Sequence, residues 1–303
     1  MFHVKHTDKM IEIKNCPVCS ATTYSKYLET EDYFFSNERF SLVKCTKCNL
    51  VFTNPIPELS KIGDYYETDK YLSHNSGSSG IIGTIYKKVR EINLKNKYSI
   101  ILKFKKEGSV IDIGSGTGEF LNYLSNRKWK TKGIEPSKNA REFARENYNI
   151  DVNEESELSN IPNEQFDVLT MWHVLEHVYN LDERMKTIVR ILKADGIAII
   201  ALPMVDSADS LQFGKYWAGL DVPRHLYHFS ANTFETLAKK YNLKIIDRYP
   251  MKFDSLYVSW LSHQAMKHSL SLLRGVLSGL KSNLKANKNS NYSSMIFVLN
   301  KSS

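Results

Sequence analysis

Two pairs of cysteines give the first part of the chain its clearest chemical signal. Cys16 and Cys19 form one C-x2-C motif, and Cys45 and Cys48 form a second one after 25 intervening residues. Each motif directs two thiolates toward one point, so the four together can close a tetrahedral zinc site with no open coordination position. Four buried thiols or a redox-active pair are the alternatives, but the doubled motif lies outside any βαβ unit. We therefore expect structural Zn2+, in a ribbon whose residues 24–28 and 39–44 form a β-hairpin.

A glycine-rich turn gives the second signal. The apolar run 109–113 enters Gly114-Ser-Gly-Thr-Gly118, and helical spacing of apolar residues follows. A strand, glycine turn and helix let a ligand approach the backbone without Cβ interference. Glu119 stands where a dinucleotide fingerprint needs its third glycine, which disfavours NAD. Asp112 would repel a pyrophosphate but suits an ammonium group, and Glu135 has the position expected for binding ribose hydroxyls.

The elements around this turn alternate between strand and helix. Further strands are expected at 131–134, 149–152, 166–171 and 196–202, and Ser230 is expected to cap a helix. A helix over 82–104 leads into this part of the chain. Such an alternation predicts an α/β fold with a doubly wound sheet that binds its ligand at the carboxyl ends of the strands.

Four segments together resemble the class I S-adenosylmethionine-dependent methyltransferases. They are V-I-D-I-G-S-G-T-G-E-F, G-I-E-P-S, F-D-V-L-T-M-W-H-V-L-E-H-V and L-K-A-D-G-I-A-I-I-A-L-P, in the family's order and spacing. The resemblance covers about 107–250 and the end, where 293–299 looks like a seventh, antiparallel strand. It implies a Rossmann-like seven-stranded sheet with a small N-terminal zinc ribbon and a helical C-terminal insertion. The cysteine motifs are similar to those of a bacterial subgroup that includes sugar and small-molecule methyltransferases.

The resemblance also implies S-adenosyl-L-methionine as the cofactor and supplies its contacts. The family's pattern assigns cofactor binding to Asp112, Gly114, Ser115, Gly116, Gly118, Glu135, Pro136, Trp172 and His173. Adenine would meet Glu155 and Ser156, after the third strand. One departure from the pattern is Arg127-Lys-Trp129, which stands where many relatives have a glycine.

Two histidines are candidates for the chemistry of methyl transfer. A sulfonium is already electrophilic, so the protein chiefly aligns the acceptor and excludes water. A hydroxyl acceptor must also lose a proton, for which histidine is suited. His177 follows the fourth strand, and His225 lies in a polar loop after the fifth. His177 could instead be an ordinary hydrogen-bonding residue, and Arg224 could bind an acceptor anion or simply pair with Asp221.

Two further segments allow more than one structural interpretation. Tyr65, Tyr66, Tyr71 and His74 either form a lid over the cofactor or pack the zinc unit, and a flexible Ser-Gly stretch follows at 76–80. The apolar segment 256–281 is an acceptor-pocket lid, an interfacial helix in peripheral contact with an anionic membrane, or a helix pair packed on the sheet edge, which we favour. After residue 238 the chain has eleven Lys or Arg and only two acidic residues.

These observations give a division of the chain and a hypothesis for its function. We expect a zinc ribbon at 1–60, a linker and lead-in helix at 61–106, and a methyltransferase domain at 107–303 with acceptor-side insertions at 203–230 and 251–290. We expect O-methylation of a small or carrier-linked acceptor, such as a sugar nucleotide. An RNA or protein methyltransferase that uses the ribbon for recognition is one alternative, and a non-catalytic binding protein is another.

Amino-acid composition limits the kinds of binding partner and the cellular location that we expect. The chain is 42% hydrophobic and 24% charged, which excludes wholesale disorder. Acidic and basic residues are mixed over 1–60 with no basic stripe, which argues against nucleic acid as a partner. There is no run of 18 apolar residues and no apolar N-terminal stretch, so we expect a soluble cytoplasmic protein.

Overall fold

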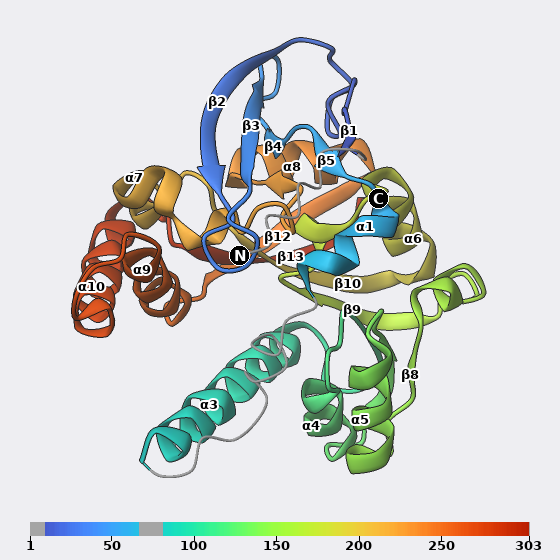
Figure 1. Ribbon diagram of the computed structural model, residues 1–303. Helices are drawn as coiled ribbons and strands as arrows, with labels where there is room; N and C mark the ends of the chain where they lie inside the picture. The colour runs from blue at the N-terminus through green and yellow to red at the C-terminus, as the bar shows by residue number, and fades with distance from the viewer. Residues whose placement is uncertain (1–9, 67–80, 303) are drawn as a thin grey trace.

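The computed structural model describes residues 10–66 and 81–302 and shows a large central sheet with a smaller sheet beside it (Figure 1). The expectations for Tyr71, His74 and the stretch 76–80 lie outside the described residues. Over the described ranges, no helix combines the length and hydropathy needed to cross a bilayer.

The central sheet has seven strands in the order β12-β13-β10-β9-β6-β7-β8. Its strands are β6 (Ser109–Ile113), β7 (Lys130–Ile134), β8 (Val152–Asn153), β9 (Phe166–Trp172), β10 (Leu192–Pro203), β12 (Leu243–Pro250) and β13 (Ser294–Lys301). β6, β7, β8, β9 and β10 pair in parallel, whereas β13 is antiparallel to both of its neighbours. The predicted doubly wound sheet and its antiparallel seventh strand are confirmed.

Two strand starts differ most from the prediction. β10 begins at Leu192, four residues before the expected start of the fifth strand at 196. The third strand was expected at 149–152, but β8 begins only at Val152. Asn149 ends the preceding helix in the left-handed conformation, with φ of 54° and a backbone N–H bonded to the carbonyls of Ala144 and Arg145. The chain therefore needs residues 149–151 to turn from the helix into the sheet.

Helices cover both faces of the central sheet. They are α3 (Ile81–Phe104), α4 (Glu119–Ser125), α5 (Lys138–Tyr148), α6 (Leu181–Ile191) and α8 (Ala231–Lys240). Neighbouring strand residues alternate between two cores: Val110 belongs to the same core as Phe120, and Ile111 belongs to the other core, with Ile188. Ser230 begins α8 with a capping box, as predicted.

The N-terminal unit is a second, four-stranded sheet in the order β11-β4-β3-β2. β2 (Tyr24–Glu31) and β3 (Arg39–Cys45) form the predicted hairpin, and β4 (Val51–Thr53) pairs with β3. The remaining strand, β11 (Tyr227–His228), comes from the loop that follows β10. Short elements complete the unit: β1 (Met10–Ile11) pairs with β5 (Ile56–Pro57), and α1 (Leu59–Ile62) precedes the 3-10 turn η1 (Gly63–Tyr65).

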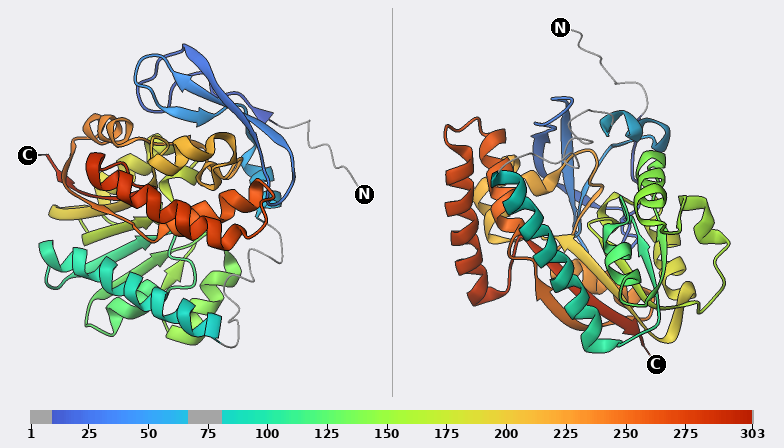
Figure 2. Two further views of the ribbon diagram at one scale, coloured as in Figure 1. Left: turned by 90° about the vertical axis from the view of Figure 1, so that its left-hand side faces the viewer. Right: turned by 90° about the horizontal axis from the view of Figure 1, so that it is seen from below.

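The two segments that were expected to be acceptor-side insertions form helices along one edge of the central sheet. α7 (Ala208–Phe213) and two 3-10 turns, η4 (Gly214–Tyr216) and η5 (Ala218–Leu220), follow β10, while α9 (Asp254–Ala265) and α10 (Ser271–Asn289) lie between β12 and β13. In the left view of Figure 2, α10 lies across the front of the molecule, on its outer side. Two further turns, η2 (Glu155–Ser159) and η3 (Leu175–His177), connect strands to helices.

A buried ion pair joins the N-terminal unit to the loop after β10. The Arg224 side chain is 1% exposed, and its Nη2 lies 3.1 Å from Oδ1 of Asp32 and 2.6 Å from Oδ1 of Asp221. Its Nη1 donates to the carbonyl of Tyr65 at 3.1 Å. The guanidinium therefore bonds simultaneously to the N-terminal hairpin, to the segment after α1 and to its own loop.

Replacing this arginine should destabilise the protein strongly. Arg224→Met leaves the buried Asp32 carboxylate without its cation, so we expect the free energy of unfolding to fall by about 3 to 5 kcal/mol in urea unfolding. Arg39→Met is the matched control, because Arg39 pairs with Glu31 at the surface, and its effect should stay within about 1 kcal/mol. Equal, small effects of both substitutions would contradict a structural role for the buried pair.

Candidate active site

The glycine turn leaves one side open to a ligand. Gly114, Gly116 and Gly118 all have left-handed backbones, with φ of 76°, 53° and 77°. A Cβ on Gly114 would lie 2.3 Å from Val174, but a Cβ on Gly116 would meet nothing within 4 Å. The backbone N–H groups of Gly114 and Ser115 donate to the carbonyl of Ile134, which fixes the turn against β7. Gly116 is thus the point where a ligand can approach the backbone.

Two carboxylates flank the turn. Asp112, at the carboxyl end of β6, is 2% exposed and accepts a 2.6 Å hydrogen bond from Oγ1 of Thr170. Burial raises the pKa of Asp112 to about 6, although Thr170 and Lys97 oppose the shift. Glu135 follows β7 and accepts hydrogen bonds from the backbone N–H groups of Gly116 and Ser137, both at 2.9 Å. The structure therefore places both predicted carboxylates beside the glycine turn.

Two buried polar atoms near the turn have no hydrogen-bond partner among the described residues. They are Oγ of Ser115 and Nε1 of Trp172. The ammonium of Lys97, from α3, lies 4.3 Å from the centre of the Trp172 ring. Burial lowers the pKa of Lys97, and Asp112 and Asp254 oppose this shift. The free hydroxyl, the free indole N–H and the open face of Gly116 fit a polar ligand such as an adenosyl amino acid.

His173 connects the end of β9 to the helical insertion. Its Nε2 lies 3.0 Å from Oδ2 of Asp254 in α9, and its Nδ1 lies 3.5 Å from Oε1 of Glu176. Burial disfavours the imidazolium, but the two carboxylates outweigh it and raise the pKa of His173 to about 10. His173 is therefore positively charged at neutral pH.

The two candidate catalytic histidines lie together against a buried carboxylate. The ring centres of His177 and His225 are 4.6 Å apart. Glu176 is fully buried; its Oε1 forms the 3.5 Å ion pair with His173, while neither of its oxygens accepts a hydrogen bond within the described part of the chain. Each of the three side chains offers one potential ligand atom, and these atoms lie within 4.8 Å of one another. Such a group could share a proton or hold a cation.

Backbone carbonyls determine which nitrogen of each histidine is free. Nδ1 of His177 lies 3.0 Å from the carbonyl oxygen of Arg224, and Nδ1 of His225 lies 2.9 Å from that of Gly219. A carbonyl only accepts hydrogen bonds, so the Nδ1 atom that faces it carries the proton and Nε2 has a lone pair. The Tyr66 hydroxyl, 2.9 Å from Nδ1 of His177, then accepts from that nitrogen as well. Burial and then repulsion from His225 lower the pKa of His177 to about 4, which makes it neutral at pH 7.

The N-terminal unit forms one side of this histidine cluster. Oγ1 of Thr53, in β4, donates to the carbonyl of His225 at 2.9 Å and lies 3.2 Å from Nε2 of His228. The hydroxyl of Tyr66 lies 2.9 Å from Nδ1 of His177. Tyr65 is instead buried in the unit itself and donates to Glu38. Of the two described tyrosines, Tyr66 thus reaches the candidate site and Tyr65 packs the N-terminal unit.

The four cysteines converge as their spacing predicts. Sγ of Cys16 lies 3.5 Å from that of Cys48, and Sγ of Cys19 lies 3.6 Å from that of Cys45. All four sulfur atoms lie within 4.8 Å of one another. A tetrahedral zinc ion with Zn–S bonds of about 2.3 Å needs sulfur atoms roughly 3.8 Å apart, so the cluster fits zinc.

Several other residues of the site belong to no motif that can be recognised in the sequence. Lys97, Thr53 and Asp254 come from elements that are distant in sequence from the residues they contact. Glu176 is different, because it adjoins the candidate His177 and its position could have been noticed. Of the residues expected at the adenine, Glu155 pairs with Arg184 and Ser156 donates to Glu154.

The geometry defines a class I methyltransferase fold with a glycine turn and a histidine cluster near the carboxyl ends of its strands. A family model described as a methyltransferase domain matches residues 87–248. This is more than half of the chain, and the protein therefore belongs to the methyltransferase domain family.

Individual relatives agree with this assignment over part of their length. An uncharacterized methyltransferase from Staphylococcus carnosus is 32% identical over 104 residues, which cover 33% of this chain and 50% of the relative. One from Alkaliphilus oremlandii is 29% identical over 109 residues, with 35% and 50% covered. The chain spans about half the length of these curated relatives.

Solved structures show the same fold at low identity. A phosphoethanolamine N-methyltransferase 2 from Haemonchus contortus, in complex with S-adenosyl-L-methionine, has 16% identity and a TM-score of 0.51, covering 92% of this chain and 69% of its own. The PH0226 protein from Pyrococcus horikoshii has 14% identity and a TM-score of 0.50, covering 78% and 98%. These similarities concern the fold alone.

Proposed function

We propose that this protein transfers a methyl group from S-adenosyl-L-methionine to an oxygen atom of a small or carrier-linked acceptor. The observation that carries the proposal is the pair of imidazoles at His177 and His225, which cluster with the buried Glu176 carboxylate and whose Nδ1 atoms face backbone carbonyls. Trp172 ends β9 and His173 follows it directly, four residues before His177, so the cofactor and a proton acceptor would share one short stretch of chain.

The cofactor would be held by the residues around the glycine turn. Asp112 would face its ammonium group, the open side of Gly116 would meet the methionine and ribose portions, and Glu135 would bind the ribose hydroxyls. Ser115 and Trp172 offer free donors. The other proposed contacts are Gly114, Gly118, Pro136 and His173. S-adenosylmethionine supplies a methyl group on a sulfonium sulfur that needs no further activation.

The acceptor hydroxyl would lose its proton to Nε2 of His225. The 2.9 Å hydrogen bond from Nδ1 to the carbonyl of Gly219 keeps the ring oriented while Nε2 accepts. The Glu176 carboxylate would stabilise the imidazolium that forms, and the neutral His177 beside it could share the proton. Glu176 would act as a positioning and charge-balancing residue.

The structure supports a small acceptor better than a macromolecular one. The N-terminal unit uses the edge of β4 to pair with β11 and buries Asp32 against Arg224, so these parts of it are occupied within the chain. We propose the same domain division as above, with β11 as the strand that the methyltransferase domain contributes to the N-terminal sheet. An RNA methyltransferase would instead bind RNA with an affinity that falls steeply with salt in filter binding.

Cofactor affinity should depend on the ionisation of Asp112. Because its pKa is raised to about 6, the affinity for S-adenosylmethionine should fall below pH 6 by up to about tenfold per pH unit as the attracting charge is lost. Isothermal titration between about pH 5 and pH 8 measures this. Asp112→Asn should bind weakly with a flat profile, and the exposed control Asp151→Asn should behave as wild type. Unchanged affinity in Asp112→Asn would show that the cofactor lies elsewhere.

Turnover should depend on His225 once an acceptor is found by screening. His225→Gln should lower kcat by roughly 10²-fold or more, because the acceptor hydroxyl loses its base, while cofactor affinity stays unchanged. His177→Gln should lower kcat less. His268→Gln is a control, since His268 contacts His263 away from the cluster. Full turnover in His225→Gln would exclude it as the base.

The cysteine cluster should hold structural zinc. We expect metal analysis of the purified protein to find about one zinc ion per chain, and Cys19→Ser to lose it together with stability. Ser20→Ala, at a neighbouring position, should retain it. A metal ion that persists when Cys16, Cys19, Cys45 and Cys48 are all replaced by Ser would instead point to Glu176, His177 and His225 as ligands and would contradict the role of His225 as a base.

A further inference from the structure

Helix α10 turns its small residues inward and its large apolar residues outward. Gly275, Gly279, Ser282 and Ala286 are buried. A Cβ on Gly275 would lie 2.4 Å from Cα of Trp260 in α9, so the two helices approach with almost no side chain between them. The apolar residues on the outer side, here called the leucine face, are Leu272, Leu273, Val276, Leu277, Leu280 and Leu284, with exposed fractions between 38% and 67%.

This arrangement is the reverse of an ordinary surface helix. A helix of a water-soluble domain usually buries its large apolar residues and exposes polar ones. Close packing through small residues, with leucines left outside, is instead typical of helices whose outer surroundings are apolar. The apolar surface continues beyond α10, since Leu270 is 73% exposed and Leu211 of α7 is 72% exposed. So many adjacent exposed apolar residues indicate an interaction surface.

The charged residues of α10 are all positive. α10 contains Arg274, Lys281, Lys285 and Lys288 and no acidic residue. None of these four side chains forms a salt bridge with another described residue. At 100° per residue the four cations lie along one flank of the leucine face.

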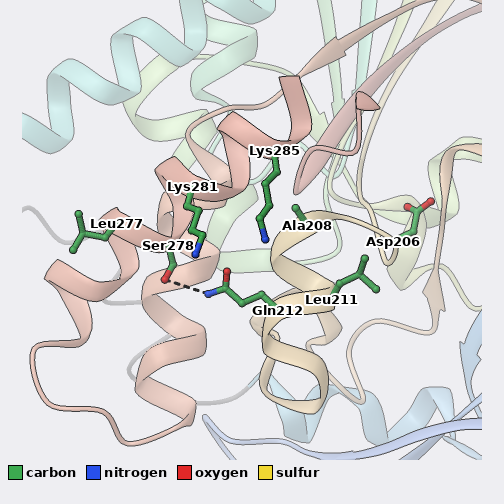
Figure 3. Close-up of a pocket in the computed structure, with 8 residues that line it drawn as sticks. All are labelled: Asp206, Ala208, Leu211, Gln212, Leu277, Ser278, Lys281 and Lys285. Atoms are coloured by element: carbon green, nitrogen blue, oxygen red, sulfur yellow. Dashed lines mark hydrogen bonds between the residues drawn. The ribbon is translucent and has the colours of Figure 1, made fainter. Parts of the chain in front are cut away.

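A cavity lies where this flank meets α7. Its volume is about 580 Å³, and Leu211, Gln212, Leu277, Ser278, Lys281 and Lys285 are among the residues that line it. Figure 3 shows the side chains of Lys281 and Lys285 extending from α10 toward α7, with Leu211 and Leu277 nearby. Asp206 lines the cavity as well and lies apart from both lysines in this view. Two ammonium groups bordered by leucines fit a phosphate headgroup above acyl chains.

We propose that the leucine face docks on the surface of an anionic phospholipid bilayer, with α10 lying in the interface and Lys281 and Lys285 at the headgroups. An apolar stripe flanked by cations is the pattern of an interfacial helix, and α10 does not have the hydropathy to span a bilayer. A second copy of the chain fits less well, because a two-fold contact would bring four unpaired cations of each copy together. This inference does not rest on the proposed methyl transfer.

Vesicle binding tests the proposal directly. Full-length protein should float with vesicles of phosphatidylglycerol and phosphatidylcholine but not with vesicles of phosphatidylcholine alone. Leu273→Ser/Leu277→Ser should reduce binding at least about tenfold, because two leucines leave the acyl region. Lys281→Gln/Lys285→Gln should reduce it about thirtyfold, since each lysine near an anionic surface contributes about 1 kcal/mol. Circular dichroism should show that each variant remains folded.

Matched variants remove equivalent residues from other surfaces. Leu59→Ser/Ile92→Ser removes two exposed apolar residues, and Lys130→Gln/Lys138→Gln removes two exposed lysines. Both should bind anionic vesicles as wild type does. The proposal is overturned if wild type does not bind anionic vesicles or if the control pairs lose binding equally. It is also overturned if sedimentation velocity finds a dimer that Leu273→Ser/Leu277→Ser dissociates.

Discussion

The buried guanidinium of Arg224 is the contact on which the candidate site depends. Its side chain pairs with Asp32 of the N-terminal hairpin and with Asp221 of its own loop, while its carbonyl accepts the hydrogen bond that orients His177. The next residue, His225, has its carbonyl bonded to Thr53. Burying the charges of Arg224 and Asp32 is unfavourable unless geometry and hydrogen bonding are good, so the benefit of this cluster lies in positioning. It makes the N-terminal unit part of the site.

The sequence predicted those elements that carry a local pattern. The apolar runs of β6, β9 and β10 and the cap at Ser230 are visible without any tertiary information, because buried parallel strands and helix starts have distinctive residues. β12 was not among the predicted strands, since charged residues such as Lys244 and Asp247 alternate along this sheet edge. β11 has only two residues and exists because β4 offers a partner. The inverted faces of α10 also required the structure, since a dense run of leucine does not say which side is buried.

The candidate site likewise contains some residues that a local sequence pattern predicts and others that only the tertiary structure brings into place. Glycine spacing and flanking carboxylates located the turn, and the cysteine pairs predicted a convergence that the sulfur positions confirm. Thr53 and Asp32 could not be predicted, because their contacts with His225 and Arg224 span more than 150 residues of sequence. Lys97 could not be predicted either, because its place over Trp172 depends on how α3 packs on the sheet. Lys128, with φ of 68°, explains the departure from the family's glycine: the turn keeps a left-handed residue but uses lysine there.

If the zinc proposed at the four cysteines orders the N-terminal unit, and that unit holds the loop that carries His225, then removing the metal should loosen both. Hydrogen exchange with mass spectrometry, before and after removal of the metal by a chelator, tests it most directly. The account predicts faster exchange both in β3 and β4 and in residues 224–228, with the amides of β6 and β9 unchanged. Faster exchange confined to residues 10–66, with 224–228 as protected as before, would contradict it.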